Sequence, residues 1–334
     1  MRITQKKLRK IAEDTVAQRT RNDRKIIGAY LIGSVLQDNA FLGGAADIDL
    51  VFVHGDDPES KREIMRLTDD VHLDIFHHGQ SRYHEGRKLR TDTNLGAMIY
   101  CAKILFDPHH LLDFTQAGVR GQYHRPDFVL SRSQHNLESA RQMWQAFQDW
   151  PQEPGPRETN EYLCALEYAA NSIANLSGEP LTERRLLLEF EERTRNVDQP
   201  GLMVGFRGLI GGSNASAEVI EAWIPEWDLT YHQAGAHSEQ IAQLHLDRRL
   251  YYRRAFEVLG SSAQPLAGLW PLLVTWTALI WQLPSDSMYW DSWFAACQKL
   301  ELVGSPLKTR LLALDAYLDT IEELLEAWGE EHGA

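Results

Sequence analysis

The sequence of 334 residues has only three cysteines and no apolar leader segment. Cys101, Cys164 and Cys297 lie far apart and show no pairing pattern, which argues for a reducing compartment and against a structural zinc site. The first 25 residues contain no hydrophobic core segment, so they do not read as a secretory signal. We therefore expect a cytoplasmic protein.

The sequence also lacks an internal repeat, a low-complexity tract and a clear membrane span. Residues 266–283 carry no charge, but Pro271 interrupts them and no basic cluster flanks them. This favours a buried helix of a bundle over a membrane-spanning helix. Residues 197–216 are glycine-rich without the strand–turn–helix order of a phosphate-binding loop, and we expect an ordinary loop there.

Length and composition indicate a globular protein of about two domains. Hydrophobic residues make up 43% of the chain and charged residues 24%, which are ordinary values. A chain of this length buries a substantial core. We expect a first domain over residues 1–125 and a helical domain over residues 126–334, where the character of the sequence changes from mixed to helical.

Three aspartates carry most of the chemical information. Asp47 and Asp49 begin a predicted strand over residues 47–54 and share one face of it, because side chains alternate along a strand. Asp74 lies in a further predicted strand, 72–77. Such a gathering of like charge is costly unless cations neutralise it. Two divalent ions bound through carboxylate oxygens can do so and can clamp both oxygens of an in-line phosphoryl displacement. The pattern therefore indicates a magnesium-dependent nucleotide site.

A glycine-serine turn precedes the aspartates and completes a family resemblance. Gly33-Ser34 follow a predicted strand over residues 26–33. In this order Gly33-Ser34, Asp47-x-Asp49 and Asp74 resemble the polymerase-beta-like nucleotidyltransferase superfamily, and within it small bacterial members such as the kanamycin and other aminoglycoside nucleotidyltransferases. The resemblance covers about residues 1–115. It implies an α+β fold, in which a small mixed sheet with helices is followed by an α-helical bundle that closes the active-site cleft.

The resemblance also implies residue roles and a reaction. Gly33 and Ser34 would hold the triphosphate, and Asp47 and Asp49 would bind two Mg²⁺ ions. Asp74 would bind the catalytic ion and help to activate the acceptor hydroxyl. The implied activity is an adenylyltransferase-type reaction. It moves an NMP group, AMP from ATP, to a hydroxyl of a small molecule such as an aminoglycoside-like antibiotic and releases pyrophosphate.

Several cations are candidates for contact with the nucleotide. Many members of the superfamily carry a basic residue soon after the serine, whereas this chain reads Val-Leu-Gln-Asp over residues 35–38. Lys103, near the start of a predicted strand over 103–108, is one candidate. The polar segment 79–94 is interpreted either as a flexible flap, one of whose cations would grip the triphosphate, or as an ordinary solvated loop. These cations are Arg82, Arg87, Lys88 and Arg90.

Two further groups of residues are expected near the chemistry. His72 should share the strand face of Asp74 and lie beside the metal site. In related two-domain enzymes a carboxylate of the helical part serves as general base, which makes Glu161 and Glu167 candidates. Both lie on a helix predicted over residues 158–177, and an ordinary exposed helix glutamate is the alternative interpretation of each.

The formal net charge of −13 bears on the partners. Residues 1–30 are basic, with nine Lys and Arg against three Asp and Glu, and we interpret them as a solvated helix face. The acidic remainder favours a cationic or neutral small acceptor over nucleic acid. Transfer to a protein or to tRNA, a non-catalytic nucleotide-binding scaffold and a structural protein with a decayed sheet domain remain alternatives. The acceptor, the base preference and the oligomeric state stay open.

The remaining elements follow from local patterns. Pro58 near a first turn, with Glu59 and Glu63 close behind it, predicts a helix over residues 58–70. Apolar spacing predicts helices over 131–150, 217–223 and 235–259 and a last helix from Ser305, as its N-cap, to about residue 328.

Overall fold

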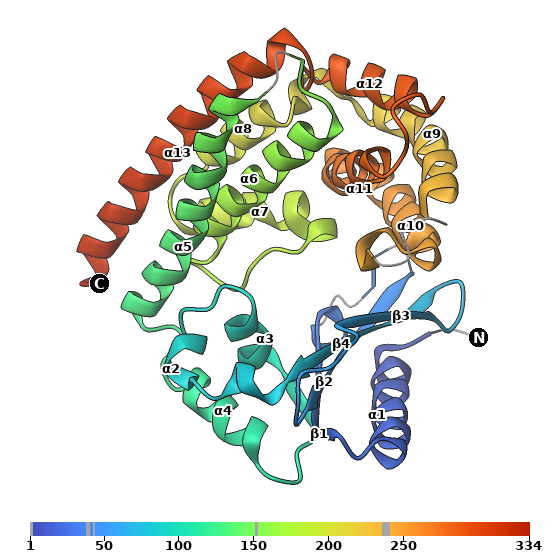
Figure 1. Ribbon diagram of the computed structural model, residues 1–334. Coiled ribbons are helices and arrows are strands. Elements are labelled where there is room, and N and C mark those ends of the chain that lie inside the picture. Colours follow the sequence, from blue (N-terminus) through green and yellow to red (C-terminus); the bar gives the residue numbers. More distant parts are fainter. Residues whose placement is uncertain (1–2, 38–40, 43, 151–152, 236–240) are drawn as a thin grey trace. The chain divides into compact units, whose positions relative to one another are not determined.

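The computed structural model describes residues 3–37, 41–42, 44–150, 153–235 and 241–334. The chain divides into two compact units, Met1–Phe128 and Val129–Ala334. The first, the N-terminal unit, combines one mixed sheet with helices, and the second, the helical unit, contains helices (Figure 1). The fold is therefore α+β with a helical C-terminal region.

The N-terminal unit is built on a five-stranded sheet with the strand order β3-β4-β2-β1-β5 (Figure 1). β1 pairs antiparallel with β2 and β5, whereas β2 pairs parallel with β4, and β4 pairs antiparallel with β3. Four of these strands were predicted from the sequence. The strands are β1 Ile26–Ile32, β2 Ala46–His54, β3 Arg62–Arg66, β4 Val71–Gly79 and β5 Lys103–Phe106.

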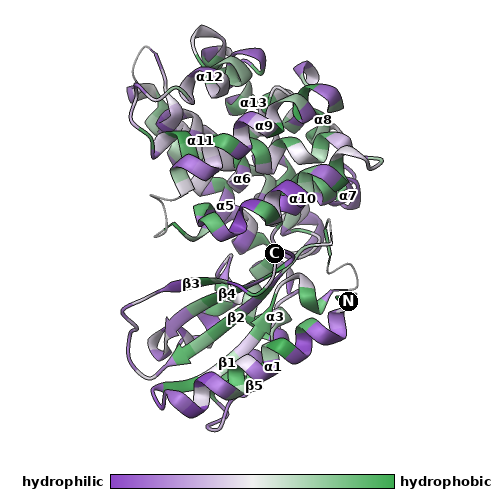
Figure 2. Ribbon diagram, turned by 90° about the vertical axis from the view of Figure 1, so that its right-hand side faces the viewer, coloured by the Kyte–Doolittle hydropathy of each residue, from purple (hydrophilic) through white to green (hydrophobic). Residues whose placement is uncertain are grey.

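Both faces of the sheet are covered, so its central strands are hydrophobic and appear largely green in Figure 2. On one face Leu50 and its neighbours pack against Leu8 and Val16 of α1, and we call this the α1 face. On the other, Val51 and Val53 belong to a cluster with residues of α3 and α4, and we call this the α3 face. The helices are α1 Gln5–Asn22, α2 Gly86–Leu89, α3 Leu95–Cys101 and α4 Leu111–Arg120, with short 3₁₀ turns η1 Ser34–Leu36 and η2 Gln80–Tyr83.

The helix predicted over residues 58–70 is wrong, because this segment forms the edge strand β3. It pairs with β4 from Arg62 opposite Phe76 to Arg66 opposite His72. Without β3, a row of backbone groups of β4 would stay unpaired, and pairing them outweighs the weak helix preference of a charged segment with two glutamates. The segment 79–94, predicted as a flexible flap, likewise contains η2 and α2.

The helical unit contains long helices joined by short connections. The helices predicted over 131–150 and 158–177 are present with shifted ends, and the predicted helix over 235–259 begins only at residue 249. The helices are α5 Pro126–Ala146, α6 Pro156–Ala174, α7 Leu186–Asn196, α8 Gly201–Leu209, α9 Ala217–Gly235, α10 Arg249–Gly260, α11 Leu269–Trp281, α12 Trp290–Lys299 and α13 Ser305–His332.

Helix α11 is the buried helix that residues 266–283 predicted. Trp270 and Trp276 are fully buried, and Trp276 donates its indole N–H to Thr230 Oγ1 on α9 at 3.1 Å. Thr275 accepts a bond of 2.9 Å from the indole N–H of Trp227 in the same way. A search of the described residues finds no helix with the length and apolar character that crossing a membrane requires.

The loop predicted over residues 197–216 is wrong, because it contains α8. Phe206 and Met203 fill the core there. A Cβ added to Gly205 would lie 3.1 Å from the ring of Tyr317 on α13, and the carbonyl of Gly208 accepts a hydrogen bond from Arg310. The glycines thus allow close approach between two helices, and this packing offsets their poor helix propensity.

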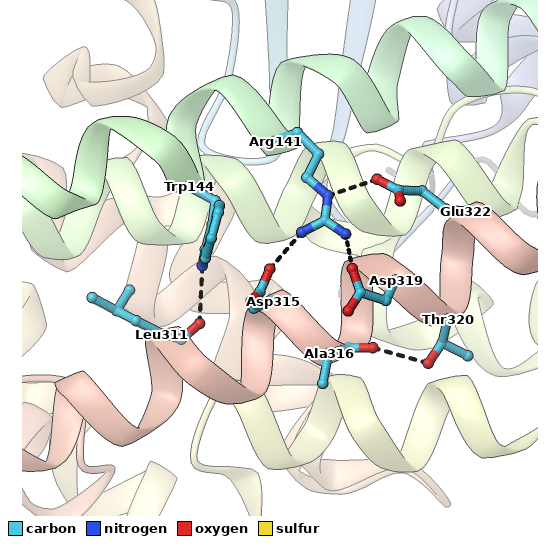
Figure 3. A network of polar contacts seen from close by, with 8 residues as sticks. All are labelled: Arg141, Trp144, Leu311, Asp315, Ala316, Asp319, Thr320 and Glu322. Atoms are coloured by element: carbon cyan, nitrogen blue, oxygen red, sulfur yellow. Dashed lines mark hydrogen bonds and ion pairs between the residues drawn. The ribbon is translucent and has the colours of Figure 1, made fainter.

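A network around Arg141 joins α5 to α13 (Figure 3). Arg141 donates to Asp315 and Glu322 at 2.6 Å each and also to Asp319. Trp144, one turn further along α5, donates its indole N–H to the carbonyl of Leu311 at 3.1 Å. Helix α13 has Gly304 rather than Ser305 as its N-cap, one residue earlier than predicted.

Candidate metal and nucleotide site

Three carboxylates from two neighbouring strands meet on the α3 face of the sheet. Asp47 and Asp49 lie on β2, and Asp49 stands directly beside Asp74 of β4 in the parallel register. One ligand oxygen of each lies within 4.8 Å of the others. Asp47 and Asp74 are buried, at 3% and 1% exposure, and Asp49 is half-buried. The structure therefore brings together the three aspartates that the sequence singled out.

Strand alternation explains this placement. Ile48 and Leu50 of β2 point to the α1 face, where they pack with Leu73 and Ile75 of β4. The residues between them must point to the other face. A slip of one residue would bury the carboxylates in the hydrophobic cluster, so the apolar residues fix the register that gathers the acids.

The Gly33-Ser34 turn lies against the same carboxylates. Ile32, the last residue of β1, pairs with Asp49, and the chain then turns at Gly33 with φ of 78°. A Cβ on Gly33 would lie 2.0 Å from Asp49 Oδ2, so only glycine fits this position. Ser34 is half-buried and begins η1. The predicted turn is thus positioned beside the acids, at the end of β1.

Arg62 is a site residue that the sequence analysis missed. Its guanidinium donates from Nε to Asp74 Oδ1 at 2.8 Å and from Nη2 to Asp74 Oδ2 at 2.6 Å. It also lies over the ring of Phe76, 4.5 Å from the centroid. The sequence analysis missed Arg62 because it predicted a helix over residues 58–70. In the structure Arg62 lies on β3, which pairs antiparallel with β4.

His72 lies beside the acids, as its position two residues before Asp74 predicted. It is 1% exposed, and its Nδ1 lies 3.8 Å from Asp47 Oδ1. His72 and Asp47 are direct neighbours in the parallel pairing of β4 with β2.

Lys103 lies elsewhere. It pairs across β1 with Leu31, which belongs to the α1 face, and its ammonium contacts Glu13 of α1 at 2.9 Å. A hydrogen bond from Lys103 lowers the pKa of Glu13. The structure therefore places Lys103 on the opposite face of the sheet from Asp47 and Asp49.

The cations of residues 79–94 have separate environments. Arg82 follows β4 within η2 and is exposed. Lys88 pairs with Glu85 at 2.5 Å, and Arg87 is exposed on α2. Arg90 donates to the carbonyl of Gly118 at 3.0 Å, so it helps to hold α4.

The two candidate general bases lie on α6 of the helical unit. Glu161 accepts hydrogen bonds from Trp150 Nε1 at 3.1 Å and from Arg157 Nε at 3.0 Å. Burial, together with the nearby carboxylate of Glu183, raises the pKa of Glu167 to about 7. A carboxyl group with such a pKa is suited to proton transfer near neutral pH.

The donor set of the aspartate site fits a hard divalent cation. Its ligand atoms are carboxylate oxygens, which Mg²⁺ prefers. Because Asp47 and Asp74 are buried, a cation that neutralises their charge would stabilise the site. Arg62 neutralises part of that charge from the β3 side. No protein-family model matches the chain, and a search of curated proteins finds no match either.

Proposed function

We propose that the protein is a magnesium-dependent nucleotidyltransferase. It moves an NMP group, AMP from ATP, to a hydroxyl of a small-molecule acceptor and releases pyrophosphate. The observation that carries this proposal is the meeting of Asp47, Asp49 and Asp74 beside the Gly33-Ser34 turn, with ligand oxygens within 4.8 Å of one another.

The aspartates would hold the magnesium. Asp47, Asp49 and Asp74 are the residues that would hold the ions, because their ligand oxygens lie within 4.8 Å of one another. When bound, Mg²⁺ supplies positive charge that neutralises and orients the phosphates. The protein would contribute by aligning the reacting groups, because rigid strands hold the carboxylates in place.

Gly33 and Ser34 would receive the triphosphate. The tight turn at Gly33 leaves no side chain between its backbone and the carboxylate of Asp49, so a phosphate can approach both. The half-buried hydroxyl of Ser34 offers a further donor at the start of η1.

Asp74 would orient the acceptor. Two hydrogen bonds from Arg62 hold its carboxylate in one orientation, from which it can accept a hydrogen bond from the acceptor hydroxyl. The hydroxyl oxygen then forms a bond to the α-phosphorus, the bond to the pyrophosphate oxygen breaks, and the hydroxyl proton passes to the carboxylate or to water.

The test is pyrophosphate release by the full chain with Mg²⁺ and each of the four common NTPs. The acceptors are a panel of hydroxyl compounds that includes kanamycin, which the sequence resemblance suggests. Release that requires Mg²⁺ and an acceptor and disappears in Asp49→Asn supports the proposal. Asp69→Asn, which changes an exposed carboxylate of the same unit, should retain it. Full release by Asp49→Asn would refute the proposed mechanism.

A further inference from the structure

A cleft of about 570 Å³ opens in the N-terminal unit at the end of β4. Residues of the β2–β3 connection, of β3, of β4 and of η2 surround it, so all of its walls belong to one unit. The lining residues that matter below are Asp57, Lys61, Arg62, Phe76, His78 and Arg82.

Arg62 connects this cleft to the aspartate site. Arg62 lines it and holds both oxygens of Asp74. Phe76 lies two residues beyond Asp74 on the same strand face, about 7 Å away by the rise of a strand. A molecule in the cleft would therefore lie beside Arg62, the partner of Asp74.

The cleft is basic although the whole chain carries a net charge of −13. Lys61, Arg62 and Arg82 line it, and Asp57 is its one carboxylate. No ion pair of Lys61 or Arg82 exists within the part of the chain that the structure describes. Asp57 packs onto the backbone of Gly79, where an added Cβ would lie 2.0 Å from its Oδ1. Two exposed cations thus face this cavity, and neither forms an ion pair with another described residue.

His78 adds a neutral hydrogen-bond donor. Its Nδ1 lies 2.7 Å from the hydroxyl of Tyr83, which lies 2.9 Å from the hydroxyl of Tyr30. If Tyr30 donates to Tyr83 and Tyr83 donates to Nδ1, the ring proton lies on Nε2. Burial lowers the pKa of His78 to about 4, so the ring stays neutral at pH 7.

The cleft and the Gly33-Ser34 turn lie on opposite sides of the acids. The turn follows β1 and touches Asp49, whereas Arg62 lies on β3 and touches Asp74. A triphosphate bound at the turn would lie on the β1 side of the carboxylates, and the β3 side would be left to the second substrate.

We propose that this cleft, lined by Lys61, Arg62, Arg82 and His78, binds the acceptor, and that the acceptor is an anionic small molecule with a phosphate or carboxylate group. That the bound anion is the acceptor rests on the proposed function. That the cleft binds an anion does not. It departs from the expectation of a cationic or neutral acceptor, because a polycationic aminoglycoside would meet cations of its own sign here.

Three matched sugars test the binding of the full chain in buffer free of phosphate, sulfate and Mg²⁺. They are glucose 6-phosphate, glucose and glucosamine, which share a ring and differ in charge, and ligand-detected NMR gives each Kd. Glucose 6-phosphate should bind at least tenfold more tightly than the other two. Its Kd should rise about tenfold in Lys61→Gln/Arg82→Gln, because each replacement removes a charge-assisted contact. The control Arg87→Gln/Lys88→Gln removes the same charge from α2, outside the cleft, and should leave the Kd unchanged.

Equal binding of the three sugars, or an equal loss in the control variant, would overturn the anion site. Calorimetric titration with Mg²⁺ and ATP then tests whether the cleft binds the acceptor or the triphosphate of the donor. ATP affinity within about twofold of wild type in Lys61→Gln/Arg82→Gln supports an acceptor cleft, whereas a tenfold loss would assign these cations to the triphosphate and overturn it. Sugar phosphate binding by a protein that binds no Mg²⁺–ATP would refute the proposed function and leave the anion site standing.

Discussion

Arg62 and Asp74 form a two-pronged ion pair in which Nε donates to Oδ1 at 2.8 Å and Nη2 to Oδ2 at 2.6 Å. The Asp74 side chain is 2% exposed, whereas the arginine side chain is 34% exposed. The pair thus links the buried acids to the open cleft. It holds a charge that would otherwise be unfavourable in the core.

Replacing Arg62 by alanine should lower the free energy of unfolding of the N-terminal unit by about 2 kcal/mol, since a buried carboxylate loses its partner and the pair is partly screened by solvent. Added Mg²⁺ should restore part of this loss, because a cation on the aspartates takes over the neutralisation. Calorimetric melting with and without Mg²⁺ measures both effects.

Arg66→Ala is the matched control at the other end of β3. Arg66 forms an exposed pair of 3.8 Å with Asp69, and its loss should change the free energy of unfolding by less than about 0.5 kcal/mol. An Arg62→Ala variant as stable as this control, with no added response to Mg²⁺, would contradict the proposed balance of charges.

Gly33→Ala should reduce nucleotide binding more than its backbone strain alone explains. The added methyl would lie 2.0 Å from Asp49 Oδ2 and must displace that carboxylate. Gly44→Ala is a precise control, since Gly44 also has positive φ, 73°, but no atom lies within 4 Å of its added Cβ. Both variants should lose about 1 kcal/mol of stability from the backbone. Only Gly33→Ala should lose affinity for Mg²⁺–ATP in a calorimetric titration; equal affinities would show that the turn does not position Asp49.

The aspartate cluster was predictable because it depends on one local rule. Apolar Ile48 and Leu50 alternate with Asp47 and Asp49, and burial of the former dictates where the latter point. The alternation of residues within one strand does not show which strand lies beside it. For that reason the sequence did not show that β3 covers the edge of β4 and brings Arg62 to Asp74.

The two wrong elements have the same physical cause. Residues 62–66 form an antiparallel hairpin with β4, the next strand along the chain, and α8 packs Gly205 against Tyr317, more than a hundred residues away. In both cases tertiary contacts override local propensity. Lys103 was misplaced for a related reason, since the sequence alone did not give its register with Leu31.

Glu167→Gln should stabilise the helical unit at alkaline pH. Burial raises the pKa of Glu167 from 4.5 to about 7, so between these values the folded protein holds a proton that the unfolded chain has released. Wild-type stability should therefore fall as the pH rises through this window. At pH 8 the free energy of unfolding of the variant should exceed that of the wild type by about 1–2 kcal/mol, because a half-buried side chain feels less than the full effect. Near pH 4 the two free energies should be equal.

Tryptophan fluorescence in urea can measure the unfolding of the helical unit in the wild type and in Glu167→Gln. All ten tryptophans lie between residues 144 and 328, within this unit. A difference between variant and wild type that stays constant from pH 4 to pH 8 would contradict the raised pKa.

Arg141→Ala should destabilise the helical unit by about 1–2 kcal/mol, since Asp315, Asp319 and Glu322 would repel one another along α13 without their common cation (Figure 3). The loss should shrink at high salt, where the repulsion is screened. Arg157→Ala, which removes an exposed pair with Glu161, should cost less than about 0.5 kcal/mol. Fluorescence-detected unfolding at low and high salt compares them, and equal costs would show that the network adds nothing beyond a single surface pair.

The central claim is that the three aspartates bind a nucleotide together with magnesium, and isothermal titration with ATP tests it most directly. Wild-type protein should bind ATP with Mg²⁺ and much more weakly without it. In Asp47→Asn the magnesium-dependent part should disappear while the melting temperature is retained. Equal binding of ATP by wild type and Asp47→Asn, or no Mg²⁺-dependent binding of any NTP, would contradict the account.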